Sequence, residues 1–319
     1  MNRWFGHLIL VLAAIGGAGV VVAETLPRCL FVSSYHQGYE WSDGVQAGIE
    51  RVLEGRCQLQ QFDMDTKRKK SKADKQAAAE RARTLIEAWK PDVMIIADDN
   101  AARYLVKPYY RDAELPIVFC GVNWSVDEYE FPYKNVTGMV EVAPLKPMLE
   151  QARELSSGSD FFYIGANTAT ERKNLSRFED AAASMQLSIS SRLVDNTQDW
   201  IDTYKDAQKH AFVVVGSHAG INDWDEKKAR AAIGPFSKRL SVTNHGWMMP
   251  VTMLGFTKVP EEHGAWAAEA ALSILDGLPA SQIPIVANRK WDLWVNRSLL
   301  EDGGISLPRN LAIKAKQVD

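Results

Sequence analysis

The sequence predicts an α/β protein made of two doubly wound lobes with a ligand cleft between them. Short apolar runs recur along the chain, and each is followed by polar residues and then by a helical pattern. This alternation begins a second time after a Ser/Gly break at 156–159. Because ligands of doubly wound sheets bind beyond the carboxyl ends of the strands, we expect the polar residues that follow each strand to face the cleft.

The first strand–helix unit sets the pattern. The apolar run 29–32 is too short for a helix and suits a buried strand. Polar and aromatic residues follow it, and from Trp41 to Leu53 apolar residues recur every four positions, as on one face of an α-helix. The turn at 33–41 is therefore expected at a binding edge.

The later strands divide the chain between the lobes. Strands of the first lobe are expected at 57–65, 93–97 and 117–120, with 135–140 leaving it. Strands of the second are expected at 161–166, 187–194, 211–216 and 241–244. Three crossings between the lobes would form a hinge, which suits closure on a ligand.

We expect residues 24–140 with about 254–280 in the N-terminal lobe, and 141–253 with about 281–319 in the C-terminal lobe.

The N-terminal residues 1–23 are typical of a signal peptide. Arg3 gives a positive start, residues 8–22 are apolar, and small residues allow cleavage after Ala23. A membrane anchor is the competing reading, but a spanning helix normally needs about 20 apolar residues. We expect export to the periplasm, without stable membrane insertion.

Three cysteines remain in the mature chain. An oxidising compartment permits a disulfide between Cys29 and Cys57, which begin the first two expected strands. The alternative, that all three are buried thiols acting as small apolar side chains, stays open.

Composition and motifs exclude several function classes. The net charge of −3 provides no basic field for nucleic acid. The histidines lack the paired spacing of a metal site, so no metal and no cofactor are expected. No nucleophile elbow and no dinucleotide-binding glycine motif occur. An enzyme is the minority hypothesis, and we expect a monomeric binding protein.

Several short motifs, in their order and spacing, link the chain to a known family. They are SSYHQGYEWSDG (33–44), MDTKR (64–68), ADDNA (97–101), VFCGVN (118–123), NVTG (135–138), VN (295–296) and GISLP (304–308). Through them the chain resembles the type I periplasmic substrate-binding proteins of ABC transporters. It is most similar to their tryptophan/tyrosine-type branch and to related periplasmic sensor domains of histidine kinases. Residues 217–247 match least well.

The resemblance implies ligand contacts from both lobes. They are Ser34, Tyr35, Trp41, Asp98, Asp99, Asn100 and Asn123, facing Thr168, Ala169 and Thr170. Carboxylates and amides hold amines and hydroxyls, and aromatic rings offer a flat wall. Other readings stay open: residues 98–100, Thr168 and Thr170 could be helix caps, and Trp41 could be core.

The function expected is capture of a small polar organic solute, with an amino acid favoured, for delivery to an ABC permease. The alternative is a soluble sensor component that reports a solute to a membrane receptor or kinase. A periplasmic enzyme on the same scaffold is the third class, because fold does not fix function.

Overall fold

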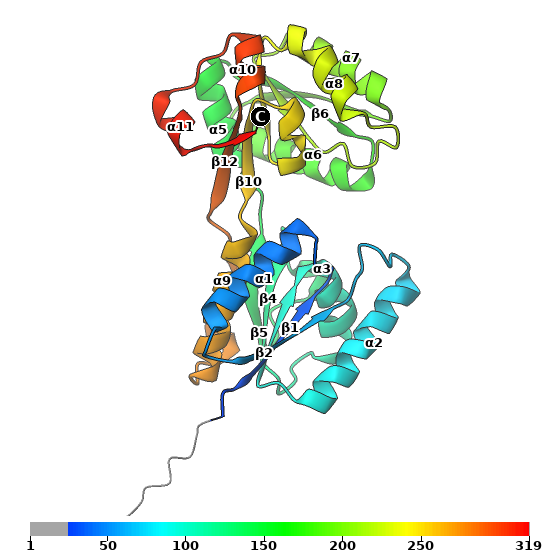
Figure 1. Ribbon diagram of the computed structural model, residues 1–319, viewed down its shortest axis with the longest axis vertical. Helices are drawn as coiled ribbons and strands as arrows, with labels where there is room; N and C mark the ends of the chain where they lie inside the picture. The colour runs from blue at the N-terminus through cyan, green and yellow to red at the C-terminus, as the bar shows by residue number, and fades with distance from the viewer. Residues whose placement is uncertain (1–24, 319) are drawn as a thin grey trace, which may run out of the picture.

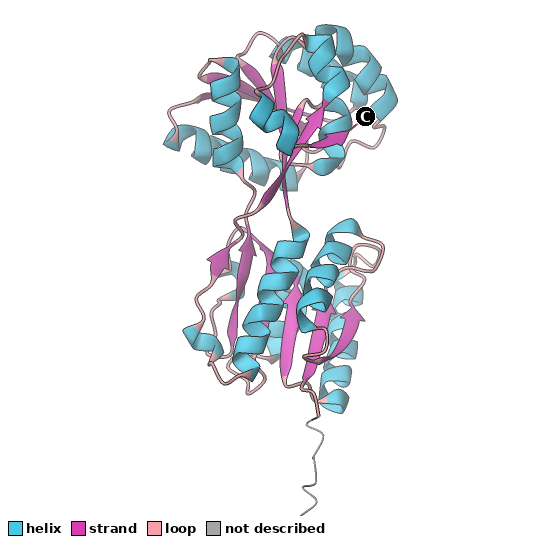
Figure 2. Cartoon of the chain, turned by 60° about the vertical axis from the view of Figure 1, so that its left-hand side comes forward, coloured by secondary structure: helices cyan, strands magenta, loops and turns pink. Residues whose placement is uncertain are grey.

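The computed structural model describes residues 25–318, so the expected signal peptide at 1–23 lies outside the described residues. The chain forms two lobes joined by three extended segments (Figure 1). Each lobe has its own sheet with helices on both faces, as the second view also shows (Figure 2). No helix in the described part of the chain is long and apolar enough to cross a membrane.

The first lobe contains a six-stranded parallel sheet in the order β11-β5-β4-β3-β1-β2. Its strands are β1 (Arg28–Ser33), β2 (Gln58–Asp63), β3 (Val93–Ala97), β4 (Ile117–Asn123), β5 (Val136–Glu141) and β11 (Val286–Ala287). Its helices are α1 (Glu40–Leu53), α2 (Lys72–Trp89), α3 (Asp98–Ala101), the π-helix η1 (Ala102–Val106), α4 (Lys107–Tyr109), α9 (Pro260–Leu275) and the 3₁₀ turns η2 (Asp127–Tyr129) and η5 (Ala280–Gln282).

The alternation of side chains along β1 builds two cores in this lobe. Leu30 and Val32 pack with α2, α3 and η1 on one face of the sheet. Cys29 and Phe31 pack with α1 and α9 on the other. All four are fully buried, as a parallel sheet covered on both faces requires.

Helices α1 and α9 lie side by side in the first lobe, although more than 200 positions separate them (Figure 1). Glycine permits this close approach. A Cβ on Gly48 would lie 2.4 Å from the carbonyl oxygen of Glu261, and one on Gly264 would lie 1.9 Å from the carbonyl oxygen of Val45. This contact anchors α9, which follows the second crossing, to the N-terminal lobe.

The second lobe contains a seven-stranded sheet in the order β13-β12-β10-β9-β8-β6-β7. Its strands are β6 (Asp160–Ala166), β7 (Ser188–Val194), β8 (Phe212–Val215), β9 (Leu240–Thr243), β10 (Leu254–Lys258), β12 (Trp291–Asn296) and β13 (Lys316–Val318). Its helices are α5 (Leu145–Ser156), α6 (Ala169–Ser184), α7 (Thr197–Ala207), α8 (Glu226–Ile233), α10 (Arg297–Gly303), α11 (Arg309–Lys314) and the 3₁₀ segments η3 (Gly234–Phe236) and η4 (Gly246–Val251).

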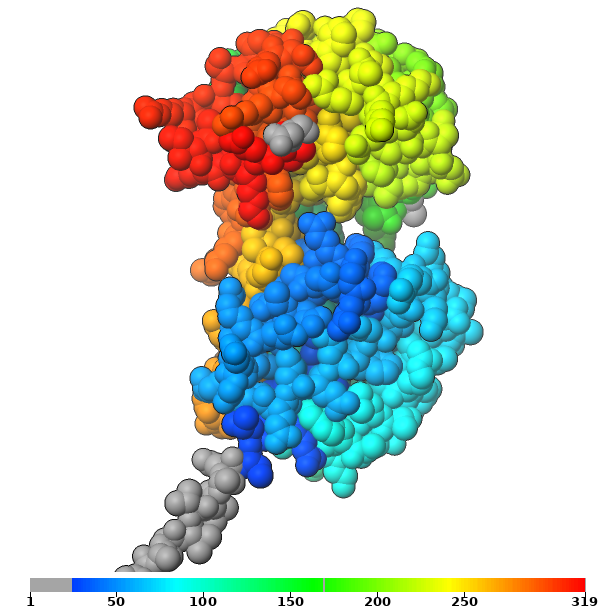
Figure 3. Space-filling model, in the orientation of Figure 1, coloured from blue at the N-terminus to red at the C-terminus, as the bar shows by residue number. Residues whose placement is uncertain are grey.

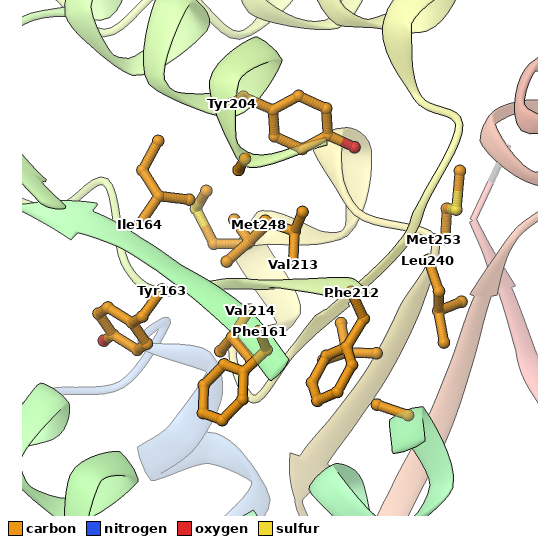
Figure 4. Close-up of a cluster of buried hydrophobic side chains, with 14 of the residues drawn as sticks. Phe161, Tyr163, Ile164, Tyr204, Phe212, Val213, Val214, Leu240, Met248 and Met253 are labelled. Atoms are coloured by element: carbon orange, nitrogen blue, oxygen red, sulfur yellow. The ribbon is translucent and has the colours of Figure 1, made fainter. Parts of the chain in front are cut away.

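Aromatic and aliphatic side chains from β6, β8 and the neighbouring elements fill the core of the second lobe (Figure 4). The rings of Phe161 and Phe212 stack with their centroids 5.1 Å apart, and the Tyr163 ring lies 5.0 Å from that of Phe178. The continuous apolar runs in β6 and β8 form buried strands, as their patterns predict.

The observed fold confirms the predicted class, two α/β lobes with mainly parallel sheets, but it corrects two strand assignments. Residues 254–258 were expected in the N-terminal lobe, yet β10 pairs with β9 and β12 in the second sheet. Residues 286–287 were expected in the C-terminal lobe, yet β11 pairs with β5 in the first. The crossings therefore lie at 142–144, 259 and 288–290. A short apolar strand suits either sheet, and its partner is set by tertiary packing.

Cys29 and Cys57 form a disulfide in the structure, with their Cα atoms 5.9 Å apart, while Cys120 is a buried free thiol. The two half-cystines lie at the start of β1 and just before β2, which are adjacent parallel strands. The bond joins residues 28 positions apart and therefore restricts the unfolded chain.

We predict that replacing both half-cystines, Cys29→Ser with Cys57→Ser, lowers the free energy of unfolding by roughly 3 to 4 kcal/mol, because the unfolded chain regains loop entropy. Urea titration followed by circular dichroism measures this. Wild-type protein treated with a reductant serves as the control and should match the double variant. Equal stability of oxidised and reduced protein would contradict the prediction.

Candidate ligand-binding site

The carboxyl ends of β1, β3, β4 and β5 meet at the edge of the first lobe that faces the second lobe. The space-filling view shows a notch between the lobes at this level (Figure 3). Most of the residues predicted for the first-lobe site lie on the loops that follow these strands. The parallel topology thus gathers side chains that are far apart in the sequence.

Ser34 and Asn100 hold the loops of this edge together. The Ser34 hydroxyl donates to the carbonyl oxygen of Ala97 at 2.5 Å and accepts from the Ala101 N–H at 2.8 Å. The Asn100 amide donates to Thr66 Oγ1 at 2.8 Å, and that hydroxyl donates to the carbonyl oxygen of Ser34 at 2.6 Å. Ser34 and Thr66 are buried. These hydrogen bonds fix β1 and α3 beneath the site.

Three carboxyl groups gather at the edge. Asp98 begins α3 and its side chain is buried. The Oδ1 atom of Asp98 accepts a hydrogen bond from Trp41 Nε1 at 2.9 Å, whereas its Oδ2 atom has no hydrogen-bond partner among the described residues. Asp99 is half-buried and accepts from the Tyr129 hydroxyl at 2.6 Å and from the Asn123 amide at 2.5 Å. The third acid, Glu141, ends β5.

Glu141 forms a hydrogen-bonded ion pair with Lys258, the last residue of β10. The Glu141 side chain is 7% exposed and that of Lys258 is 24% exposed. The pair links the end of a first-lobe strand to the end of a second-lobe strand. Its partners lie 117 positions apart in the sequence.

The pKa values of the two buried carboxyl groups, Asp98 and Glu141, are raised. Burial raises the pKa of Asp98 well above its usual range, and the nearby Glu141 and Asp99 raise it further. Burial also raises the pKa of Glu141, although Lys258 opposes this shift. Lys67 lowers both pKa values more weakly. The site therefore has three carboxyl groups beside the half-buried ammonium group of Lys258 and the more distant one of Lys67.

Backbone geometry at Asp98 brings the acids close. Asp98 lies in the left-handed region, with φ of 69°, a conformation that Asp tolerates better than most residues. Gly121 on the neighbouring strand β4 also has positive φ, 67°, and a Cβ there would lie 3.0 Å from Asp98 Oδ1 and 3.5 Å from Trp41 Nε1. Glycine at this position suits the positive φ and leaves the hydrogen bond between Trp41 and Asp98 uncrowded.

Aromatic rings surround the acids. The Tyr35 ring meets the Tyr39 ring edge-on with centroids 5.3 Å apart, and Lys67 Nζ lies 4.3 Å from the Tyr35 centroid. The Trp41 ring lies 5.2 Å from the ring of His263, and Lys258 Nζ lies 5.4 Å from the Trp41 centroid. Such rings can provide both a flat wall and a partner for a cation.

The two histidines near Lys258, the buried His263 and the partly buried His245, are neutral. Burial, with a smaller contribution from Lys258, lowers the pKa of His263 to about 3 and that of His245 to about 3. They therefore add no positive charge near neutral pH, and Lys258 is the main cation that balances Glu141.

In the second lobe, the predicted residues lie at the start of α6. Thr168 is the N-cap of α6, and its hydroxyl accepts a hydrogen bond from the Glu171 N–H at 3.1 Å. This confirms the expectation that Thr168 could be a helix cap. Thr170 is exposed. The side chain of Ala169 lies outside the described part. No contact among the described residues joins Thr168 or Thr170 to the predicted residues of the first lobe. Glu171 itself is buried and accepts from the Tyr163 hydroxyl at 2.5 Å and the Ser217 N–H at 2.8 Å.

An exposed indole also lies at this edge of the second lobe. Trp247, in η4 after β9, is 53% exposed. Its Nε1 donates to Ser217 Oγ at 3.3 Å, and its ring centroid lies 4.6 Å from that of His245. The tryptophan is thus positioned from two sides while its face stays accessible to solvent.

The sequence predictions missed Glu141, Lys258, His263 and Trp247, as well as Tyr129, which donates to Asp99. A sequence signal existed for the first two, since each is a charged residue that directly ends an apolar strand pattern. Nothing in the local sequence pattern indicates, however, that Glu141 and Lys258 pair with each other.

Within the described residues, no group of three or more histidine, cysteine, aspartate or glutamate side chains is arranged to hold a metal ion.

Neither a protein-family profile nor a curated protein sequence matches this chain. Solved structures do match. A ligand-free, open substrate-binding protein with adhesive properties from Clostridium difficile superposes with a TM-score of 0.73 at 13% identity, covering 92% of this chain and 99% of the other. An ABC domain in complex with L-Trp from Streptococcus pneumonia gives 0.60 at 13% identity, covering 92% and 100%. A periplasmic ribose ABC transporter protein from Conexibacter woesei gives 0.55 at 10% identity, covering 88% and 96%.

These similarities, at low identity, show the fold: two parallel-sheet lobes as in the type I periplasmic binding proteins. These three structures are described as those of a substrate-binding protein and of ABC-transporter proteins, and another match is a LacI family transcriptional regulator from Bifidobacterium animalis, with a TM-score of 0.57 at 10% identity.

We predict that Asp98→Asn stabilises the ligand-free protein near neutral pH. The pKa of Asp98 in the folded protein is raised above its unfolded value of 3.8. The protonated carboxyl group therefore contributes stability that is fully present below pH 3.8 and is lost as the pH rises through the folded-state pKa, because the buried group must then carry a charge. Asn keeps the left-handed backbone without the buried charge. Thermal midpoints from pH 4 to pH 8 measure the difference, which should be largest at high pH and shrink toward pH 4. A variant that is less stable at pH 7 would contradict this.

We predict that Lys258→Met lowers the free energy of unfolding by about 3 kcal/mol at pH 7, because it leaves Glu141 buried without its partner. Adding Glu141→Gln should recover part of this loss. Urea titration of the two single variants and the double variant forms the cycle. Strictly additive losses would show that the two side chains do not stabilise each other.

Proposed function

We propose that this chain is an extracytoplasmic solute-binding protein that captures a small organic solute with an ammonium group, an amino acid above all, between its lobes and delivers it to an ABC permease. The observation that carries this proposal is the excess of acid at the first-lobe edge. Asp98, Asp99 and Glu141 lie together there, and of the three only Glu141 forms an ion pair among the described residues, with the half-buried Lys258. A cationic ligand supplies the charge that the empty site lacks.

Asp99 is the proposed primary contact for the ligand ammonium group. It is the one acid of the three that is not buried, and its two hydrogen-bond donors, Tyr129 and Asn123, hold the carboxylate in place. Behind it, Glu141 is paired with Lys258, and the raised pKa of Asp98 lets this carboxyl lose its proton when a cation binds nearby. Tyr35 and Trp41 provide the aromatic wall beside this position.

The second lobe would cover the bound solute. Thr168, Thr170 and the backbone at 169 lie at the N-terminus of α6, where free N–H groups favour a carboxylate. The exposed ring of Trp247 offers a second flat surface. An amino acid carries an ammonium group for the first edge and a carboxylate for the second, which is why this class is favoured. The solute stabilises the closed arrangement only by its extra affinity for it.

The proposal includes the domain division and the location. We assign 25–141 with 260–287 to one lobe and 145–258 with 291–318 to the other, following the sheets. The signal peptide, the periplasmic location, a monomeric state, the absence of catalysis and the tryptophan/tyrosine-type branch rest on the sequence motifs. The disulfide agrees with an oxidising compartment.

A thermal-shift screen of residues 24–319 tests the function. Amino acids, amines, sugars and organic acids are compared, each amine with its analogue that lacks the ammonium group. We expect amine-bearing solutes alone to raise the midpoint, since binding to the folded form contributes about 2.7 kcal/mol at a hundredfold excess over the dissociation constant. A shift from sugars only, or from no class, would contradict the proposal.

We predict that Asp99→Ala weakens binding of the solute found in that screen by about tenfold or more, because a charge-assisted contact is lost. The thermal midpoint of the empty protein should change little, since the side chain is not fully buried. Isothermal titration calorimetry measures the affinity. Asp276→Ala, an exposed aspartate at the end of α9 in the same lobe, is the matched control and should bind like the wild type. Unchanged affinity in Asp99→Ala would remove this residue from the site.

A further inference from the structure

A second cavity lies at the hinge, with a volume of about 500 Å³. Its walls come from both lobes and from two of the crossings: Trp124 after β4, residues 142–147, Asn288 and Trp291, and the side of α6 that carries Arg177 and Ser184. The volume is within the range of small-molecule sites in proteins.

This hinge cavity is separate from the acidic site. Glu141 pairs with Lys258, whereas the next residue, Val142, lines the cavity. In the same way Asn123 bonds to Asp99, whereas its neighbour Trp124 lines the cavity. Successive side chains along an extended segment point to opposite sides, so Glu141 and Val142 face different sites. Trp124 follows the end of β4 with a φ of 63°, so the chain turns there and separates its indole from the Asn123 amide.

The walls of the hinge cavity are mostly apolar and flat. Trp124 and Trp291 contribute indole rings, and Pro144, Leu145 and Pro147 contribute aliphatic surface. Aromatic walls of this kind favour a planar apolar body.

The polar groups of the hinge cavity favour an anion. The guanidinium carbon of Arg177 lies 5.4 Å from the Trp124 centroid, and its nearest described acid, Asp180, is at 4.0 Å. Lys146 adds a second positive charge. Asn288 is 9% exposed, and its Oδ1 accepts from the Val142 N–H at 2.7 Å, whereas its Nδ2 has no acceptor among the described residues. The lining of the hinge cavity thus holds two cationic side chains, Arg177 and Lys146, and one amide donor, but only one acid, Asp180.

We propose that the hinge cavity is a second binding site, for a small molecule with a planar apolar ring and a carboxylate. The ring lies between Trp124 and Trp291, and the carboxylate accepts from Arg177 and from Asn288 Nδ2. Such a ligand lacks the ammonium group that suits the acidic site. This inference does not depend on the function proposed for that site.

Calorimetric titration of the chain from residue 24 to 319 with 1-naphthoate tests the proposal. We expect saturable binding of one molecule per chain, and binding of the neutral 1-naphthalenemethanol about tenfold weaker. Arg177→Gln should weaken binding of 1-naphthoate by about tenfold. The matched control is Lys173→Gln, which removes one exposed positive charge from the same helix outside the cavity lining and should bind like the wild type.

Two further variants locate the probe. Ser184→Trp places a large side chain at the exposed rim of the cavity and should abolish binding, whereas Asp99→Ala should leave it unchanged. Circular dichroism checks that each variant is folded. Absence of saturable binding, equal losses in Arg177→Gln and Lys173→Gln, or a loss in Asp99→Ala with none in Ser184→Trp would overturn the proposal.

Discussion

The ion pair between Glu141 and Lys258 is the interaction on which the rest of the site depends. It joins the last residues of β5 and β10, where the chain passes between the lobes. Burying two charges costs free energy that only good pairing offsets, so this pair fixes the positions of both crossing segments. Lys258 also lies beside Trp41 and contributes to the neutrality of His245 and His263. The positions at which β5 and β10 end therefore determine where the charges of Glu141 and Lys258 lie in the acidic site.

The acidic site illustrates how a binding site lowers the stability of the empty protein. Asp98 has one carboxylate oxygen without a partner and a backbone in the left-handed region. Both features cost free energy, and they persist because β3, β4 and the Trp41 indole hold the residue from several sides. In our account the ammonium group of the solute binds at the neighbouring Asp99, and its charge stabilises the ionised form of Asp98. A site that is fully satisfied when empty would gain less from binding.

Much of the fold could be predicted from the sequence because its signals are local. A short apolar run, a polar turn and a four-residue apolar repeat identify each strand–helix unit without any tertiary information. The sheet to which a strand belongs is not a local property, and β10 and β11 were accordingly placed in the wrong lobes. The disulfide was left open for the same reason, since side-chain direction decides whether Cys29 and Cys57 meet. The loops after β1 and β3 were predicted as a site, but Glu141 and Lys258 were missed because 117 positions separate them.

The most direct test of this account is the number of protons released when an amine-bearing solute binds. Titration calorimetry near pH 6, repeated in buffers of different ionisation enthalpy, measures that number. Because a bound ammonium group lowers the raised pKa of Asp98, we expect net proton release at pH 6 and none in Asp98→Asn. Binding without proton exchange, or with proton uptake, would contradict the claim that the acidic site is completed by a cation.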